Sequence, residues 1–165
     1  MKTFKSFKAL ANELREVQKV VLPETYAVIL DRFGIEAMRD AKEDIIGVTS
    51  PFQGAVNPWG GKSFGPWAAH SPSTIAIKSQ FGRGKGGDPY TYLYDTGEMY
   101  ESIEYTVTGI TMVSVGSNSD HAVKSEYGDG VIDPRPFLGP AIIRTALKQK
   151  ASIQKLFGEA LSWGA

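Results

Sequence analysis

The sequence lacks cysteine, net charge and any long apolar run, and each absence excludes a class of protein. Without cysteine there is no disulfide, no thiolate nucleophile and no thiolate-bound metal, which suits a reducing cytoplasm. Eighteen lysines plus arginines balance eighteen aspartates plus glutamates, so no field of the whole molecule attracts nucleic acid or an acidic membrane. The two histidines, His70 and His121, lack the spacing of a zinc motif. We therefore expect no metal, no other cofactor and no membrane span.

The 165 residues fit one domain, and an apolar content of 42% is enough to build a core. Three regions follow one another within the single domain 1–165. Residues 1–47 are helical in pattern, residues 48–92 form an extended loop region, and residues 93–165 contain a capped helix, a hairpin and a terminal helix. This order predicts an α+β fold with N-terminal helices, a long loop region, a small antiparallel β-sheet and a C-terminal helix.

Two amphipathic helices are predicted at the start of the chain. Apolar residues recur every three or four positions over residues 4–21 and again over residues 26–45. Pro23 suits the first turn of the second helix, and Gly47 suits its C-terminal end. Packing between helices accounts for these apolar residues without any ligand pocket.

The middle of the chain is rich in proline and glycine, which disfavours long regular elements over residues 48–92. Trp59 and Trp67 lie in this region, and large aromatic residues in a loop pack on the core or against a partner. We expect mobility in the free protein and ordering by neighbouring subunits, which makes both tryptophans candidate interface residues. One short ordered stretch is expected at 71–79, as a helix or a strand.

Alternating apolar and polar residues predict a β-hairpin over 104–115, turning at Thr108 and Gly109. Residues 121–127 form a short segment whose type the pattern leaves open. From Ala141 onward, apolar residues at helical spacing predict the terminal helix.

The tripeptide Asp95-Thr96-Gly97 is also the active-site signature of aspartic proteases. Those enzymes need two carboxylates that share a proton, whereas this chain holds one copy of the tripeptide. Helix capping explains the segment better, with Asp95 as the N-cap and Glu98 completing a capping-box-like pair. We therefore expect no catalytic residue, and a protease that uses Asp95 is the remote alternative.

The glycine-rich segment GRGKGG at 82–87 matches the dinucleotide fingerprint by letter only. Asp88 and Pro89 follow it where the fingerprint requires a helix. Lys78, Arg83 and Lys85 could contact a nucleic-acid backbone, but cations in such a loop are more often simply solvated. A small nucleotide- or nucleic-acid-binding domain is thus a minor alternative.

The segment DPRPFLGPA at 133–141 predicts a rigid start to the terminal helix, with Phe137 and Leu138 in the core. Arg135 stands between two prolines and has two readings. The favoured reading is an ion pair with a nearby acid, either Asp133, Glu126 or Asp95. The other makes Arg135 a third candidate interface residue that docks a partner.

Three segments together carry a resemblance to a known family. They are GPWAAHSPSTIAIKSQFG at 65–82, LYDTGEMYESI at 93–103 and VSVGSNSDHAVKSEYGDGVIDPRPFLGPA at 113–141. In this order they resemble the virion-morphogenesis, or tail-completion, proteins of tailed bacteriophages. The family pattern has Trp-Pro-Leu-Ser where this chain continues from Trp67 with Ala-Ala-His, and Tyr-Ala where it has His121 and Ala122.

The resemblance implies a non-enzymatic structural protein of the virion neck or proximal tail, assembled in the host cytoplasm. By family analogy its copies form a ring, a hexamer, around the channel through which genomic DNA passes without sequence-specific contact. Its expected partners are its own copies and neighbouring neck or tail proteins, such as a tail terminator, a head-completion protein or the tail tube. A tail terminator or head-completion protein is also the alternative identity within the same class.

Overall fold

The computed structural model describes residues 7–16, 19, 21–47 and 65–161, and the fold is α+β, as the sequence predicts. Its elements, in chain order, are α1 (Phe7–Glu16), α2 (Leu22–Ile46), α3 (Pro72–Gln80), a 3₁₀ turn (Lys85–Gly87), α4 (Glu98–Glu101), β1 (Ile103–Thr108), β2 (Met112–Ser117), α5 (Asp120–Tyr127) and α6 (Leu138–Leu161).

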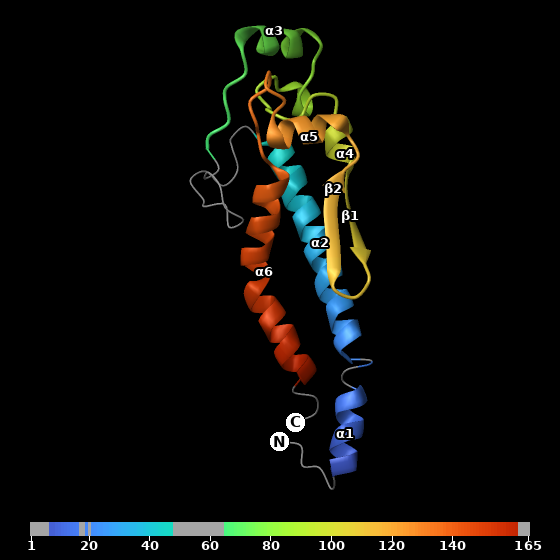
Figure 1. Ribbon diagram of the computed structural model, residues 1–165. Helices are drawn as coiled ribbons and strands as arrows, with labels where there is room; N and C mark the ends of the chain where they lie inside the picture. The colour runs from blue at the N-terminus through green and yellow to red at the C-terminus, as the bar shows by residue number, and fades with distance from the viewer. Residues whose placement is uncertain (1–6, 17–18, 20, 48–64, 162–165) are drawn as a thin grey trace.

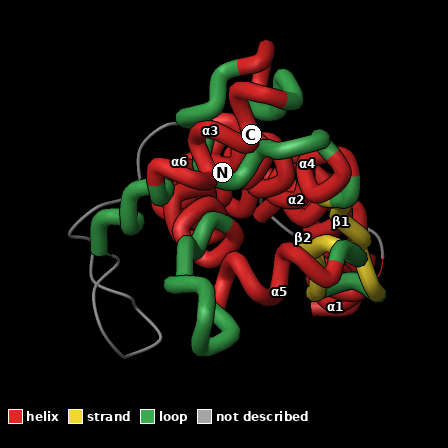
Figure 2. Tube along the Cα trace, turned by 90° about the horizontal axis from the view of Figure 1, so that it is seen from above, coloured by secondary structure: helices red, strands yellow, loops and turns green. Residues whose placement is uncertain are grey.

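Two long helices, α2 and α6, lie side by side and form the stalk of an elongated molecule (Figure 1). The hairpin β1–β2 lies along α2, and α1 lies beyond the lower end of α2. At the upper end α3, α4 and α5 gather with their connecting loops into a head, which comprises residues 65–101 and 118–137. Seen from above in Figure 2, these three helices spread around the ends of the two long ones.

The predicted second helix is confirmed as α2. A proline lies in its first turn, and the N–H of its C-cap Gly47 donates to the carbonyl of Asp44 at 3.2 Å. Its inner face places Ala37, Ala41 and Ile45 fully out of solvent. The small alanines allow α6 to approach closely, so this face forms the centre of the stalk.

Both stretches whose type the sequence left open are helices capped by serine. Ser71 precedes α3, and its Oγ accepts a hydrogen bond from the N–H of Thr74 at 3.2 Å. Ser119 precedes α5 and accepts from the N–H of His121 at 3.4 Å. Local side-chain capping therefore decides the identity of two elements too short to show a periodicity.

The predicted hairpin is confirmed, with β1 and β2 antiparallel from Ile103 opposite Ser117 to Thr108 opposite Met112. Tyr105 of β1 lies with its ring against Gly34 of α2. Its hydroxyl donates to Oδ1 of Asp31 at 2.8 Å. Gly34 thus provides the space into which the hairpin docks on α2.

Replacing Gly34 by alanine is expected to lower the free energy of unfolding by about 1–3 kcal/mol, because the new Cβ would overpack against the Tyr105 ring. Its ideal position lies 2.7 Å from Cγ of that ring. Without this contact, glycine to alanine in a helix stabilises by about 1 kcal/mol. Gly158→Ala in α6 is the matched control, since its Cβ meets nothing within 4 Å. Urea unfolding of both variants decides the sign, and a stabilised Gly34→Ala protein would contradict the docking.

The main core lies where the stalk meets the head. Phe137, Ile103 and Ile45 are fully buried there, and Trp67, Met99 and Ala122 complete the cluster together with Ala41 and Ala141. The predicted burial of Phe137 is confirmed, whereas Leu138 is only partly buried at the edge of the cluster. Four separate segments of the head and stalk meet in this core.

Candidate functional site

The three segments that carry the family resemblance meet in the core of the head. Residues 65–82 contribute Trp67, residues 93–103 contribute Met99 and Ile103, and residues 113–141 contribute Ala122 and Phe137. Segments that are separate in sequence therefore build one packed unit. The candidate site lies on this unit, around Tyr92.

Tyr92 lies among two other rings and a guanidinium group, and we call Trp67, His70, Tyr92 and Arg135 the Tyr92 cluster. The ring of Trp67 meets Tyr92 edge to face, with centroids 5.6 Å apart. The His70 ring lies 5.1 Å from Tyr92, and the Arg135 guanidinium lies 5.2 Å from the centre of the Tyr92 ring. Cation–π attraction and ring packing thus join the loop before α3 to the loop before α6.

Trp67 is part of the interior of the head, so its prediction as an exposed interface anchor is wrong. Only 7% of the residue is exposed. Its indole Nε1 is buried and has no hydrogen-bond partner among the described residues. The proline- and glycine-rich sequence around it misled because it does not reveal that the loop folds back on its own core. The other candidate tryptophan, Trp59, lies outside the described residues.

Arg135 does not form the predicted ion pair. Within the described chain no carboxylate lies within 4.0 Å of its guanidinium, which instead donates from Nη2 to the carbonyl of Ala68 at 2.9 Å. Burial lowers the pKa of Arg135 below its ordinary value, against the influence of Tyr92 and Asp133. Its role at an interface stays a prediction.

Of the three acids proposed to pair with Arg135, Glu126 has a role that the sequence did not suggest. Its carboxylate accepts the backbone N–H groups of Phe137 and Leu138 at 2.9 and 3.0 Å, and that of Gly139 at 2.9 Å. These are free donors at the start of α6, so Glu126 caps that helix from α5. The separation of eleven to thirteen residues hides this cap from any motif of local spacing.

The predicted N-cap at Asp95 is wrong as well. Helix α4 begins at Glu98 with Gly97 as its N-cap, in a left-handed conformation with φ of 97° and no side-chain cap. Asp95 is too far upstream to reach the first turn, and its carboxylate pairs with Nη1 of Arg83 at 3.1 Å. Glu98 accepts from the hydroxyl of Ser119 at 3.1 Å and so ties α4 to the start of α5.

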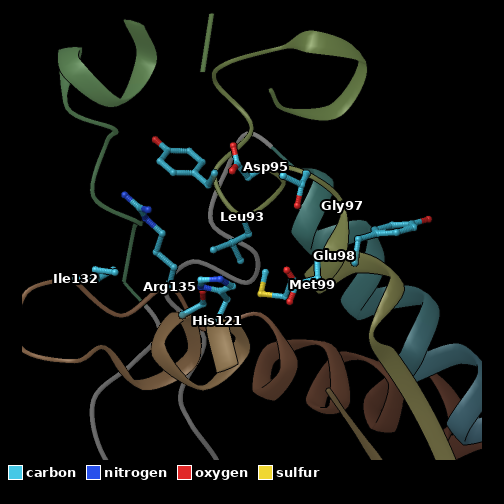
Figure 3. Close-up of a pocket in the computed structure, with 12 residues that line it drawn as sticks. Leu93, Asp95, Gly97, Glu98, Met99, His121, Ile132 and Arg135 are labelled. Atoms are coloured by element: carbon cyan, nitrogen blue, oxygen red, sulfur yellow. The ribbon is translucent and has the colours of Figure 1, made fainter. Parts of the chain in front are cut away.

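A cavity of about 320 Å³ opens beside the Asp95-Thr96-Gly97 segment (Figure 3). Asp95, Glu98, His121 and Arg135 contribute polar groups to its wall, and Leu93, Met99 and Ile132 are among its apolar lining. An aspartic protease needs two carboxylates that share a proton, whereas the Asp95 carboxylate is neutralised by Arg83. Among the described residues, no group of three or more histidine, aspartate or glutamate side chains could hold a metal ion.

The glycine-rich loop after α3 is organised by a buried lysine. Nζ of Lys78 donates to the carbonyls of Thr91 and Tyr94 at 2.6 and 2.8 Å, and burial lowers its pKa. Lys78 therefore acts inside the fold, which corrects the prediction that it is solvated. The loop contains a 3₁₀ turn where the dinucleotide fingerprint requires a helix, so its geometry does not favour nucleotide binding.

A second polar cluster lies in the stalk between α2 and α6, and we call Asp40, Asp44, Arg144, Thr145 and Lys148 the stalk cluster. Burial alone would raise the pKa of Asp40, but Lys148, Arg144 and Thr145 outweigh it and lower that pKa. Burial raises the pKa of Asp44 to about 6, although its Oδ1 lies 2.9 Å from Nη2 of Arg144.

Asp44 makes stability depend on pH in a direction opposite to that of most acids. Its carboxyl holds a proton to higher pH in the folded chain than in the unfolded chain, so its contribution is largest below pH 3.8 and is lost as pH rises through about 6. The shift corresponds to about 3 kcal/mol. The side chain is only 10% exposed, so solvent screening is small.

We therefore expect the unfolding free energy of the wild type, minus that of Asp44→Asn, to fall by up to about 3 kcal/mol between pH 4 and pH 7. Urea unfolding at several pH values measures this difference. Taking the difference cancels the titration of Asp40 and of the other shared groups. A difference that stays flat with pH would show that Asp44 titrates normally.

No model of a known protein family matches the sequence, and no curated protein or solved structure matches the chain. Among the described helices, none is both long enough and apolar enough to cross a membrane. The argument for function therefore depends on the residues of the head and on the segments that build it.

Proposed function

We propose that the protein is a structural component of a tailed-bacteriophage virion, which completes the tail or neck and joins head to tail. One observation carries the proposal. The segments 65–82, 93–103 and 113–141, on which the resemblance rests, supply residues to the same core. Their order in the sequence therefore reflects one packed unit, which supports a relationship more strongly than three separate short matches would.

The surface of the protein supports a role in assembly. Tyr127 is 79% exposed and Phe81 is 64% exposed on the head, and Ile110 is 60% exposed at the turn of the hairpin. Single apolar side chains on a surface are common, but large ones at several points of one small domain favour contacts with other subunits. A ring of copies around the DNA channel would bury such residues.

The tail-terminator and head-completion alternatives draw on the same support and differ in the neighbour that the protein contacts. The aspartic-protease alternative has weaker support, because the Asp95 carboxylate is paired with Arg83 and stays 45% exposed. A shared proton needs a second carboxylate beside it instead of a cation.

Deleting the gene from the phage that encodes the protein tests the proposal. We expect DNA-filled heads and polymerised tail tubes, but few infectious particles, because the junction between them is faulty. Electron micrographs of the lysate should show unjoined heads and tails or defective tails. Empty, unprocessed capsids would contradict the proposal and favour a maturation protease.

Complementation with Asp95→Ala separates the two readings further. Loss of an exposed ion pair costs about 0–1 kcal/mol, so a structural protein should retain infectivity. Loss of a catalytic acid would abolish it. Lysates that contain soluble Asp95→Ala protein but few infectious particles would therefore revive the protease.

A further inference from the structure

The turn between α5 and α6, residues 129–133, displays aliphatic side chains between two acids. Val131 is 92% exposed and Ile132 is 46% exposed. Oδ1 of Asp129 accepts the N–H groups of Val131 and Ile132 at 3.0 and 2.8 Å, and these bonds lower the pKa of Asp129. Gly128 and Gly130 both adopt positive φ. The backbone hydrogen bonds preorganise the turn, so binding through it would cost little ordering entropy.

A surface of complementary charge lies at the end of α3 and on the loop after it. We call Ile77, Phe81, Arg83, Lys85 and Tyr90 the basic aromatic surface. Ile77, Phe81 and Tyr90 are 50%, 64% and 60% exposed, and Arg83 lies over the Phe81 ring at 5.4 Å. Residues 77–90 contain three cations and a single acid, Asp88. A cavity of about 260 Å³, lined by Ile77, Arg83 and Tyr92 among others, opens beside this surface.

The turn does not occupy this cavity in its own chain. Ile132 lines the other cavity, the one beside Asp95, His121 and Arg135. Seen from above, α3 and α5 are well separated in the head (Figure 2). The acidic turn that follows α5 and the basic aromatic surface are thus two different contact surfaces on one molecule.

We propose that the 129–133 turn of one copy docks on the basic aromatic surface of a second copy. Val131 and Ile132 would enter the apolar cavity between Ile77 and Tyr92, while Asp129 and Asp133 face Arg83 and Lys85. Opposite charges around an apolar centre select this orientation over a contact between two like surfaces. The occupant is a second copy because one chain carries both halves of the match.

A contact between two different surfaces is heterologous and repeats from copy to copy, so it closes into a ring or extends into a filament. The inference rests on the proposed function in taking closure into a ring, and it names the contact that would hold that ring together. The docking itself concerns the purified chain alone, so it is tested separately from infectivity.

The experiment uses the full chain with Val131→Asp or Phe81→Asp, and measures mass by sedimentation over a range of concentrations. Each variant places a carboxylate in the contact and should weaken self-association about thirtyfold or more. Both side chains are largely exposed, so melting temperatures should match that of the wild type. Ile110→Asp is the control, because Ile110 is 60% exposed on the hairpin, away from both surfaces. It should leave self-association unchanged.

Mixing the two variants distinguishes this contact from a symmetric one. Val131→Asp retains a normal basic aromatic surface and Phe81→Asp retains a normal turn, so the mixture should form a one-to-one complex and nothing larger. A wild type that stays monomeric at its highest soluble concentration would overturn the docking. So would variants that assemble normally, a mixture that forms no complex, or dissociation caused by Ile110→Asp. Head-to-tail assembly in a protein whose deletion leaves phage infectivity normal would refute the proposed function alone.

Discussion

Replacing Trp67 by alanine is expected to destabilise the isolated monomer by about 3–5 kcal/mol. The residue is 7% exposed, packs edge to face on Tyr92 and belongs to the cluster that contains Phe137 and Ile103. Its truncation leaves a large cavity where head and stalk meet. Because single domains are typically stable by about 5–15 kcal/mol, a substantial part of the stability would be lost. Urea unfolding of the purified monomer measures the effect.

Two further variants make this test specific. Trp67→Phe keeps an aromatic ring and removes the buried Nε1 that has no partner among the described residues, so it should recover most of the loss. Tyr127→Ala truncates an aromatic residue that is 79% exposed, and should change stability by less than about 0.5 kcal/mol. A Trp67→Ala monomer as stable as the wild type would place Trp67 outside the core and return it to the surface.

Elements with a strong local pattern could be predicted from the sequence. The proline and glycine at the ends of α2 mark its limits, and the alternation of residues 104–115 indicates the hairpin. In both cases the interactions that define the element join residues close in sequence. A pattern of period 3.6 or 2 records which face is buried, and so it survives without knowledge of the tertiary structure.

Contacts in the head could not be predicted because they join residues far apart in sequence. Arg135 donates to Ala68 across 67 positions, and a nearby acid is a poor guide when a distant carbonyl and the Tyr92 ring are available. Asp95 was misjudged for a local reason. The left-handed conformation of Gly97 starts α4 later than the spacing of Asp95 and Glu98 suggests.

The largest electrostatic effect is expected from Asp40→Ala, at about 3–5 kcal/mol of lost stability. The Asp40 side chain is 2% exposed, and its Oδ2 accepts from Arg144, Thr145 and Lys148 at 3.3, 3.1 and 3.0 Å. Its removal leaves the fully buried hydroxyl of Thr145 without this acceptor, and leaves Arg144 partly buried with Asp44 as its remaining carboxylate. The cost comes from uncompensated polar groups, which is larger than the net value of the intact ion pair.

A double-mutant cycle with Arg144→Ala tests this explanation at pH 7. Once Arg144 is absent, the loss of Asp40 strands one charge fewer, so the double variant should be more stable than the sum of the single effects predicts, by about 1 kcal/mol or more. Glu43→Ala is the matched control, because Glu43 is 63% exposed and its contact with Arg39 is 3.9 Å long. That change should cost less than about 0.5 kcal/mol. Additive effects of Asp40→Ala and Arg144→Ala would mean that the two residues contribute independently and that the stalk is held by its apolar face alone.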